Sequence, residues 1–193
     1  GNPPLEALSN PDKPIDTIII NASDQDLLTT TVQHTIKAEI NAVQKGVHIL
    51  RQITGVKNII LAVPRDTIQG FGHMEAELKA VDTAYPSALP TMIMKTLLNK
   101  TVPQENCCED LGVCFIGAEA VASIGRAFLE NCVPVTKKVT FIDKAGESIL
   151  VEARIGTPIS EIFSALGTTL SDGDRVILGG PMRGTAVYSE DHT

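Results

Sequence analysis

The cysteines are the most reactive side chains of this chain. They lie at Cys107, Cys108, Cys114 and Cys132, and no two of them form a C-x-x-C pair. Adjacent residues such as Cys107 and Cys108 cannot coordinate one metal ion without further ligands, so the spacing argues against a zinc or iron–sulfur site in this chain. We therefore expect ordinary free thiols in a reducing compartment, behaving as small hydrophobic residues.

Histidine and serine indicate no catalytic site. His34 and His48 lie in a stretch with helical spacing, and several turns of helix separate them too widely to bind one metal directly. The serines Ser123, Ser160 and Ser164 lack the G-x-S-x-G context of a hydrolase nucleophile. We assign no residue a catalytic role and no residue a metal-binding role.

The charge of the chain limits its partners. The formal net charge is −7 over 193 residues, and the only short basic cluster is Lys137-Lys138. Nucleic acid and anionic lipid surfaces demand clustered lysine and arginine, so we expect neither as a partner. No apolar run reaches the ~18 to 20 residues that cross a bilayer, so we expect no direct membrane insertion.

The two ends of the sequence suggest a piece of a longer protein. The chain starts at Gly1 without a methionine and ends in the polar segment Ser189–Thr193. We therefore expect a fragment cut from a longer protein, in which Gly1 would be a remnant of cloning. Residues 1–14 hold four prolines and no periodicity, which predicts an irregular lead-in.

Strands and helices are expected to alternate over residues 15–134. Short apolar, β-branched runs predict buried strands, and apolar residues three and four apart predict helices. The expected strands are Thr17–Ile20, Ile59–Val63 and Gly112–Ile116. The expected helices are one long helix from Val32 to Leu50 that ends at Gly55, a second over Phe71–Val81, a third over Pro90–Leu98 and a fourth over Ala118–Leu129. This alternation predicts an α/β domain with a doubly wound, mainly parallel sheet.

A different order begins after Val133-Pro134. Val139–Ile142 and Ser148–Val151 are expected strands on either side of a turn at Asp143–Gly146, and a helix follows that ends at Gly167. The last expected strand is Arg175–Leu178. Hairpin, helix and returning strand are the order of a small β-grasp (ubiquitin-like) module, which we place at residues 135–193 and expect to fold on its own.

Three segments in a fixed order resemble a known family. They are Ile15–Asn21, Tyr85–Ser87 and Leu178–Gly184, and together they resemble the C subunit of Rnf electron-transport complexes. More distantly they resemble the subunit of respiratory complex I that carries flavin and binds NADH. The likeness extends from about Lys13 to Tyr188, and it implies a flavin domain followed by a soluble-ligand-binding β-grasp (SLBB) domain.

The resemblance implies five cofactor-binding positions, namely Asn21, Asp24, Asp26, Tyr85 and Glu119. Asp24 and Asp26 stand where relatives carry a Glu-x-Glu pair near the flavin and nicotinamide, so their shorter side chains leave ligand contact open. The alternative is that Ser23, Asp24 and Asp26 begin or cap the long helix, whose N-terminus favours negative charge. Both interpretations stand at this point.

Several family residues are replaced here. Ala88, Pro90 and Thr91 stand where relatives have the glycine, glutamate and lysine of Tyr-Pro-x-Gly-x-Glu-Lys, so the resemblance implies the loss of a cation for a flavin phosphate. Gly117 starts a segment that in relatives contains asparagine. The family's glycine-rich phosphate loop does not occur in this chain, and its iron–sulfur ligands would follow the end of the chain.

The string Gly179–Gly184 is the most unusual local sequence. In relatives it follows the last β-grasp strand, which implies a rigid turn at a contact between domains. Arg183 is then placed to contact a partner or an anionic ligand.

Two functions remain open. In the first, the chain is a fragment of an Rnf-C-like subunit that passes electrons from NADH to FMN and then to iron–sulfur clusters. The flavin site is expected to be degenerate, with no cofactor held by this fragment, while FMN, NADH and [4Fe–4S] clusters are expected in the parent. In the second, it is a non-catalytic docking or soluble-ligand-binding module that kept the fold. Either way we expect other subunits of an electron-transfer complex as partners, at the cytoplasmic side of a membrane.

Overall fold

The computed structural model describes residues 5–187. Residues 1–4 and the polar end Ser189–Thr193 lie outside the described residues. The expectation of a fragment depends on these two ends. Contacts divide the chain into two compact units. Unit 1 comprises Gly1–Gln25 and Val32–Pro134, whereas unit 2 comprises Asp26–Thr31 and Val135–Thr193.

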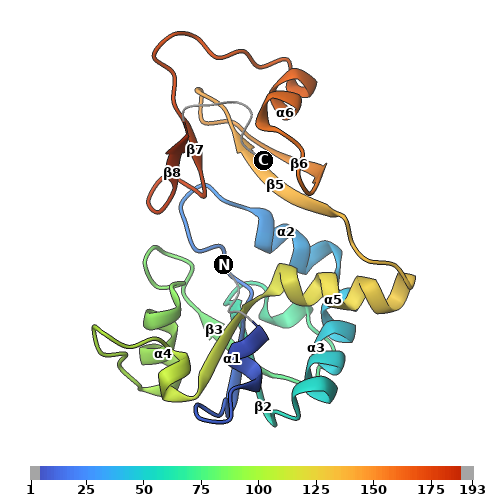
Figure 1. Cartoon of the computed structure of the whole chain (residues 1–193), viewed down its shortest axis with the longest axis vertical. Coiled ribbons are helices and arrows are strands. Elements are labelled where there is room, and N and C mark those ends of the chain that lie inside the picture. Colours follow the sequence, from blue (N-terminus) through green and yellow to red (C-terminus); the bar gives the residue numbers. More distant parts are fainter. Residues whose placement is uncertain (1–4, 188–193) are drawn as a thin grey trace. The chain divides into compact units, whose positions relative to one another are not determined.

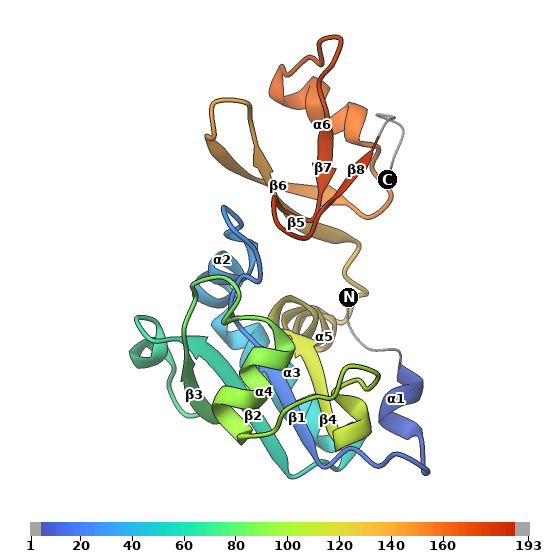
Figure 2. The same cartoon turned by 90° about the vertical axis from the view of Figure 1, so that its left-hand side faces the viewer.

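Unit 1, which contains the elements labelled α1, α3, α4 and α5 in Figure 1, is built on a four-stranded parallel sheet. Its strand order is β3-β2-β1-β4, which can be followed in Figure 2. The strands are β1 Thr17–Asn21, β2 Asn58–Pro64, β3 Glu77–Val81 and β4 Val113–Gly117. Every residue of β1 is buried, as the run of isoleucines predicts for a central strand covered on both faces. The expected parallel α/β sheet is confirmed.

Helices cover both faces of this sheet, as Figure 2 shows. They are α1 Leu5–Ser9, α2 Thr31–Ala38, α3 Ile40–Thr54, α4 Pro90–Leu98 and α5 Ala118–Glu130, with 3-10 turns η1 Ile68–Gly70 and η2 Glu109–Leu111. Ile18 and Ile20 point to the face with the core of α3 and α5, whereas Ile19 points to the opposite face, where Ile93 and Met94 of α4 are buried. The alternation of β1 side chains thus builds two cores from one strand.

The expected single helix from Val32 to Leu50 is wrong, because the structure has two helices. α2 ends at Ala38, and Glu39 leaves helical geometry with φ −125° and ψ 34° before α3 begins. Its carboxylate forms an ion pair with Arg126 of α5, at 3.1 Å between Oε2 and Nη1. Ile36 and Val43 lie in the same core on either side of the break, so the apolar spacing continues through it. The predicted end at Gly55 is confirmed, since this residue caps α3 in the left-handed region.

The helix expected over Phe71–Val81 is also wrong. This segment ends in β3, which pairs in parallel with β2, with Leu78 opposite Leu61. Phe71, Met74 and Leu78 still pack against the core, but they do so from a loop and an edge strand. The spacing of three and four residues between these apolar side chains is therefore not evidence of a helix here.

Up to residue 187, where the described part of the chain ends, unit 2 contains two antiparallel hairpins and one helix. Its elements are β5 Thr136–Ile142, β6 Ser148–Arg154, α6 Ile159–Leu166, β7 Val176–Leu178 and β8 Thr185–Val187. Phe163 of α6 packs edge-on against Phe141 of β5, with 5.7 Å between the ring centroids. The turn between β5 and β6 is closed by Asp143, whose carboxylate accepts the amides of Ala145 and Glu147. The hairpins β5-β6 and β7-β8 form separate sheets, so the β-grasp assignment remains a prediction.

Among the helices of residues 5–187, none has both the length and the apolar character of a membrane-spanning segment.

Candidate functional site

The strand order places the topological switch point of the sheet between β1 and β4. From β1 the chain continues to β2 and then to β3 on one side of β1, whereas β4 pairs with the other side of β1. Ligands of open parallel sheets bind at this point of reversal, outside the carboxyl ends of the strands. Asn21 and Gly117 are paired as the last residues of the two strands. The predicted residues that follow these strands therefore lie at the edge where a ligand would be expected.

Asn21 is 2% exposed and is bonded on both sides of its side-chain amide. Its Nδ2 donates to the carbonyl of Ala88 at 2.9 Å, and its Oδ1 accepts the amide of Ser23 at 3.1 Å. Asn21 thereby holds the loop after β1 against the loop that precedes α4. Its bonds are internal to unit 1.

Asp24 is buried and lies at the start of α2. Its two oxygens accept the amides of Val32 at 3.0 Å and Gln33 at 3.2 Å, which are otherwise unpaired donors of the first helical turn. Burial raises the pKa of the Asp24 carboxyl, and the two amides partly offset that rise. The helix-capping interpretation is confirmed for Asp24.

Tyr85 lies in an exposed turn between β3 and α4. The Tyr85-Pro86 peptide is cis, and the amide of Ser87 donates to the carbonyl of Ala84 at 2.7 Å. Ala88 is buried at 2% exposure, and its carbonyl accepts the bond from Nδ2 of Asn21. Pro90 then occupies the first turn of α4.

Glu119 lies in the first turn of α5, directly after β4. The residue before this helix is Gly117, which provides no side-chain cap. Glu119 makes an interaction of its own within the chain. Its position at the carboxyl edge is the one that the resemblance implies, and a carboxylate there also complements the helix dipole.

Asp26 belongs to unit 2, unlike the other four predicted site residues. Its Oδ1 accepts the amide of Met182 at 3.0 Å and its Oδ2 accepts the amide of Arg183 at 2.9 Å. The hypothesis that Asp26 caps the long helix is therefore wrong. Its carboxylate binds the loop between β7 and β8, and Oδ1 also accepts the amide of Leu27 at 2.7 Å.

Ser23 is a polar residue that the sequence predicts only as part of a helix cap. It is 1% exposed, and its hydroxyl has no partner within the described residues, whereas its amide is bonded to Asn21. Its place two residues after a buried strand is the sequence signal for this position. The role of the Ala88 carbonyl could not be predicted, because a backbone acceptor leaves no trace in residue types.

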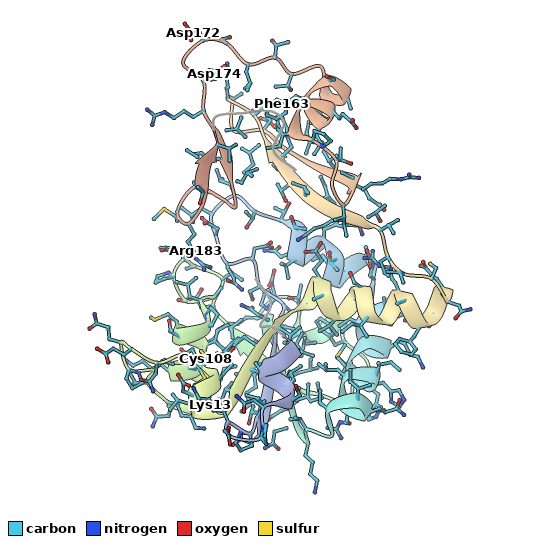
Figure 3. All side chains as sticks on the ribbon, viewed as in Figure 1. Lys13, Cys108, Phe163, Asp172, Asp174 and Arg183 are labelled. Atoms are coloured by element: carbon cyan, nitrogen blue, oxygen red, sulfur yellow. The ribbon has the colours of Figure 1, made fainter. Side chains whose placement is uncertain are left out.

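The cysteine loop has an arrangement of its own. Asp110 accepts the backbone amide of Cys107 at 2.8 Å and its thiol at 3.1 Å, and it also pairs with Lys13. That thiol-to-carboxylate bond raises the pKa of Cys107, and burial raises the pKa of Cys108 to about 11. Figure 3 labels Cys108 and Lys13. Across residues 5–187 no three His, Cys, Asp or Glu side chains gather in a way that could hold a metal ion.

One further cavity lies at the opposite edge of the sheet. It has a volume of about 310 Å³, and its lining includes Thr17, Asn58 and Glu77, the first residues of β1, β2 and β3. Ligands of parallel sheets bind at the carboxyl ends, so this cavity is not the expected flavin site.

The comparison with protein families decides the relationship. Residues 3–126 match the family described as the Nuo51 FMN-binding domain, which is more than half of the chain. The chain belongs to this family. The predicted resemblance to the Rnf C subunit is confirmed by relatives that are named as the C subunit of an ion-translocating oxidoreductase complex. The relative from Citrobacter koseri is 27% identical over 182 residues, covering 88% of this chain and 25% of the relative.

A second relative of the same name comes from Buchnera aphidicola. It is 27% identical over 187 residues, covering 92% of this chain and 39% of the relative. The chain thus spans well under half the length of both relatives. Among solved structures, a NAD+-reducing [NiFe]-hydrogenase in the H2-reduced state aligns with a TM-score of 0.58 at 16% identity, covering 82% of this chain and 34% of that chain. That likeness supports the fold.

Proposed function

We propose that this chain is the scaffold part of an Rnf-C-like electron-transfer subunit and that its flavin site is degenerate. One observation carries the proposal: polar side chains at the predicted flavin positions are engaged by the chain's own backbone. Asn21 holds Ala88 and Ser23, and Asp24 holds the start of α2. A ligand would have to replace these bonds, and a buried group that loses its partner is destabilising by about 1–3 kcal/mol.

The residues present do not fit FMN well. When FMN is bound in the family, it is the group that exchanges hydride and single electrons. Ala88 places a buried methyl group where relatives have glycine, and α4 begins with Pro90-Thr91 where relatives have an acid and a lysine. Within this proposal, residues 90 and 91 at the start of α4 therefore supply no cation for a flavin phosphate.

Within this proposal, residues 15–134 act as the flavoprotein-like domain and residues 135–193 as the SLBB-like domain. Other subunits of an ion-translocating oxidoreductase complex are the proposed partners, since the relatives carry that name. Four free thiols suit a reducing compartment, which favours the cytoplasmic side of the membrane that such a complex occupies.

Flavin titration tests the proposal. FMN fluorescence should be quenched only weakly by the chain, with a dissociation constant above about 10 μM, equivalent to roughly 7 kcal/mol. The matched variant restores the family pattern by Ala88→Gly, Pro90→Glu and Thr91→Lys together, and it should bind FMN more tightly than the parent chain. Tight binding of FMN by the unaltered chain, with the absorbance band of bound flavin, would refute degeneracy.

A further inference from the structure

The hairpin between β7 and β8 presents two backbone amides to one carboxylate. The amides of Met182 and Arg183 donate to different oxygens of Asp26, at 3.0 and 2.9 Å. Figure 3 labels Arg183, which lies in this hairpin. Successive backbone amides that point to one side form a concave anion-binding site, called a nest. This geometry resembles recognition of a carboxylate by a binding loop more than an ordinary surface contact.

Glycines make room for the carboxylate. Gly180 has φ +104°, and a Cβ atom there would lie 2.7 Å from Cγ of Asp26. Gly184 closes the loop by donating its amide to the carbonyl of Gly180 at 2.8 Å. A side chain at Gly180 would therefore be strained by the backbone angle and would also collide with Asp26. The unusual glycine content of this string thus has a local physical reason.

The segment that carries Asp26 makes a second contact within unit 2. The hydroxyl of Thr31 lies 2.7 Å from that of Thr140 in β5, and the amide of Thr30 donates to the same hydroxyl at 3.3 Å. Segment 26–31 therefore contacts both hairpins, which do not pair with each other. The described apolar residues of unit 2 that are buried are Ile159 and Phe163, so its core is small.

We infer that the Gly179–Gly184 hairpin is a carboxylate-binding nest and that Asp26 is its occupant in this chain. Through this contact, segment 26–31 becomes a structural part of unit 2, although its neighbours in sequence belong to unit 1. The ligand class of the nest is a carboxylate, because the loop gives one amide to each oxygen of Asp26, whose Oδ1 also accepts the amide of Leu27 at 2.7 Å. The inference does not depend on whether FMN binds. It assigns a structural role to Asp26, for which the resemblance implies a position near the flavin.

Amide hydrogen exchange in the full chain tests the nest. In Asp26→Ala, exchange at the amides of Met182 and Arg183 should become about tenfold faster, the factor that corresponds to about 1.4 kcal/mol. Asp26→Asn retains one acceptor oxygen without the charge and should give a smaller acceleration. Asp172→Ala is the matched control, since Asp172 is exposed in the same unit, and it should leave both amides unchanged.

Chemical rescue tests the ligand class. Sodium formate added to Asp26→Ala should slow exchange at these two amides again, whereas sodium chloride at equal ionic strength should not. Equal rates in Asp26→Ala, Asp172→Ala and the unaltered chain would overturn the inference, and so would identical effects of formate and chloride.

A variant that loses the fold of unit 2 also gives a defined result. If Asp26→Ala removes the dispersed resonances of residues 135–187 but leaves those of β1 to β4, the contact is needed for unit 2 and the inference is supported. Asp26→Asn then supplies the exchange rates. Rates in Asp26→Asn equal to those in Asp172→Asn would contradict it.

Discussion

Gly46 of α3 and Gly125 of α5 each lie against a backbone carbonyl of the opposite helix. A Cβ atom at Gly46 would lie 2.0 Å from the carbonyl oxygen of Val121, and one at Gly125 would lie 1.8 Å from that of Ala42. Both distances are far shorter than any Cβ contact tolerates, and the atoms met are backbone atoms that cannot rotate away. The two glycines therefore set how closely α3 and α5 pack beneath the sheet.

Alanine at either glycine should force these helices apart. Gly46→Ala and Gly125→Ala should each lower the free energy of unfolding by about 3 kcal/mol or more, because overpacking in a dense core moves the backbone. Gly70→Ala is the control, since a Cβ atom there meets nothing within 4 Å, and it should change stability by about 0.5 kcal/mol or less. Urea denaturation of the three variants measures this. Equal stability of Gly46→Ala and Gly70→Ala would contradict the close packing.

Asp24 should make unit 1 less stable as the pH rises through its titration. Its pKa is raised in the folded chain because burial disfavours the charged form, so the folded state holds a proton more tightly than the unfolded state. Between the unfolded pKa near 3.8 and the higher folded value, stability therefore falls with increasing pH. Asp24→Asn removes this dependence and keeps an acceptor for one amide of α2.

The measurement for Asp24 is a difference curve. The free energy of unfolding of the unaltered chain minus that of Asp24→Asn should decline as the pH rises above 3.8 and should level off above the folded pKa of Asp24. A difference that increases with pH would mean that the bonds from Val32 and Gln33 outweigh burial, and that the folded pKa is lowered.

The thiols should be unequal in their reaction with iodoacetamide at neutral pH. Burial raises the pKa of Cys114 to about 12 and that of Cys108 to about 11, so both should react only when the chain unfolds. Cys107 is exposed, but its bond to Asp110 favours the thiol over the reactive thiolate. Cys132 is exposed and should be alkylated first. Mass spectrometry of timed samples gives the order.

A variant isolates the effect of the carboxylate on Cys107. Asp110→Asn removes the negative acceptor and should accelerate alkylation of Cys107 several-fold, whereas Glu105→Gln, a neutralisation elsewhere in the same loop, should have a smaller effect. If Asp110→Asn leaves the rate unchanged, access rather than protonation limits this thiol.

Much of the sheet could be predicted from the sequence because short β-branched runs have few alternatives. β1, β2 and β4 lie where such runs predict them, and Gly55 and Gly167 end helices in the left-handed conformation. The failures have physical causes. β3 is an edge strand with mixed burial, so Glu77–Val81 lacks a clear apolar run.

The candidate site was less predictable than the sheet. Asp24 and Asp26 are two residues apart, so the resemblance assigns both to one site. In the structure, Asp24 caps α2, whereas Asp26 accepts the amides of Met182 and Arg183. Neither partner is visible in residue types, because both are backbone amides. Burial decides what Asn21 does as well, and burial at the end of a strand depends on the loop that covers it.

Asn21 provides the sharpest test of the proposed scaffold role, since its side chain both donates and accepts. Asn21→Asp has nearly the same shape and can still accept the amide of Ser23, but an ionised carboxylate cannot donate to the carbonyl of Ala88. A buried charge facing a carbonyl oxygen should lower the free energy of unfolding by about 3–5 kcal/mol at neutral pH. Protonation restores the donor, so the loss should shrink as the pH falls toward about 4, the ordinary range of an aspartate.

Thermal and urea unfolding of Asn21→Asp across this pH range measure the effect. Asn106→Asp is the control, because Asn106 is exposed and its replacement introduces the same charge into the chain. It should change stability by about 0.5 kcal/mol or less at every pH. If Asn21→Asp matches Asn106→Asp at neutral pH, the bond between Asn21 and Ala88 does not hold the two loops together. The carboxyl edge would then be open to a ligand, and the proposal that its polar groups are already engaged would fail.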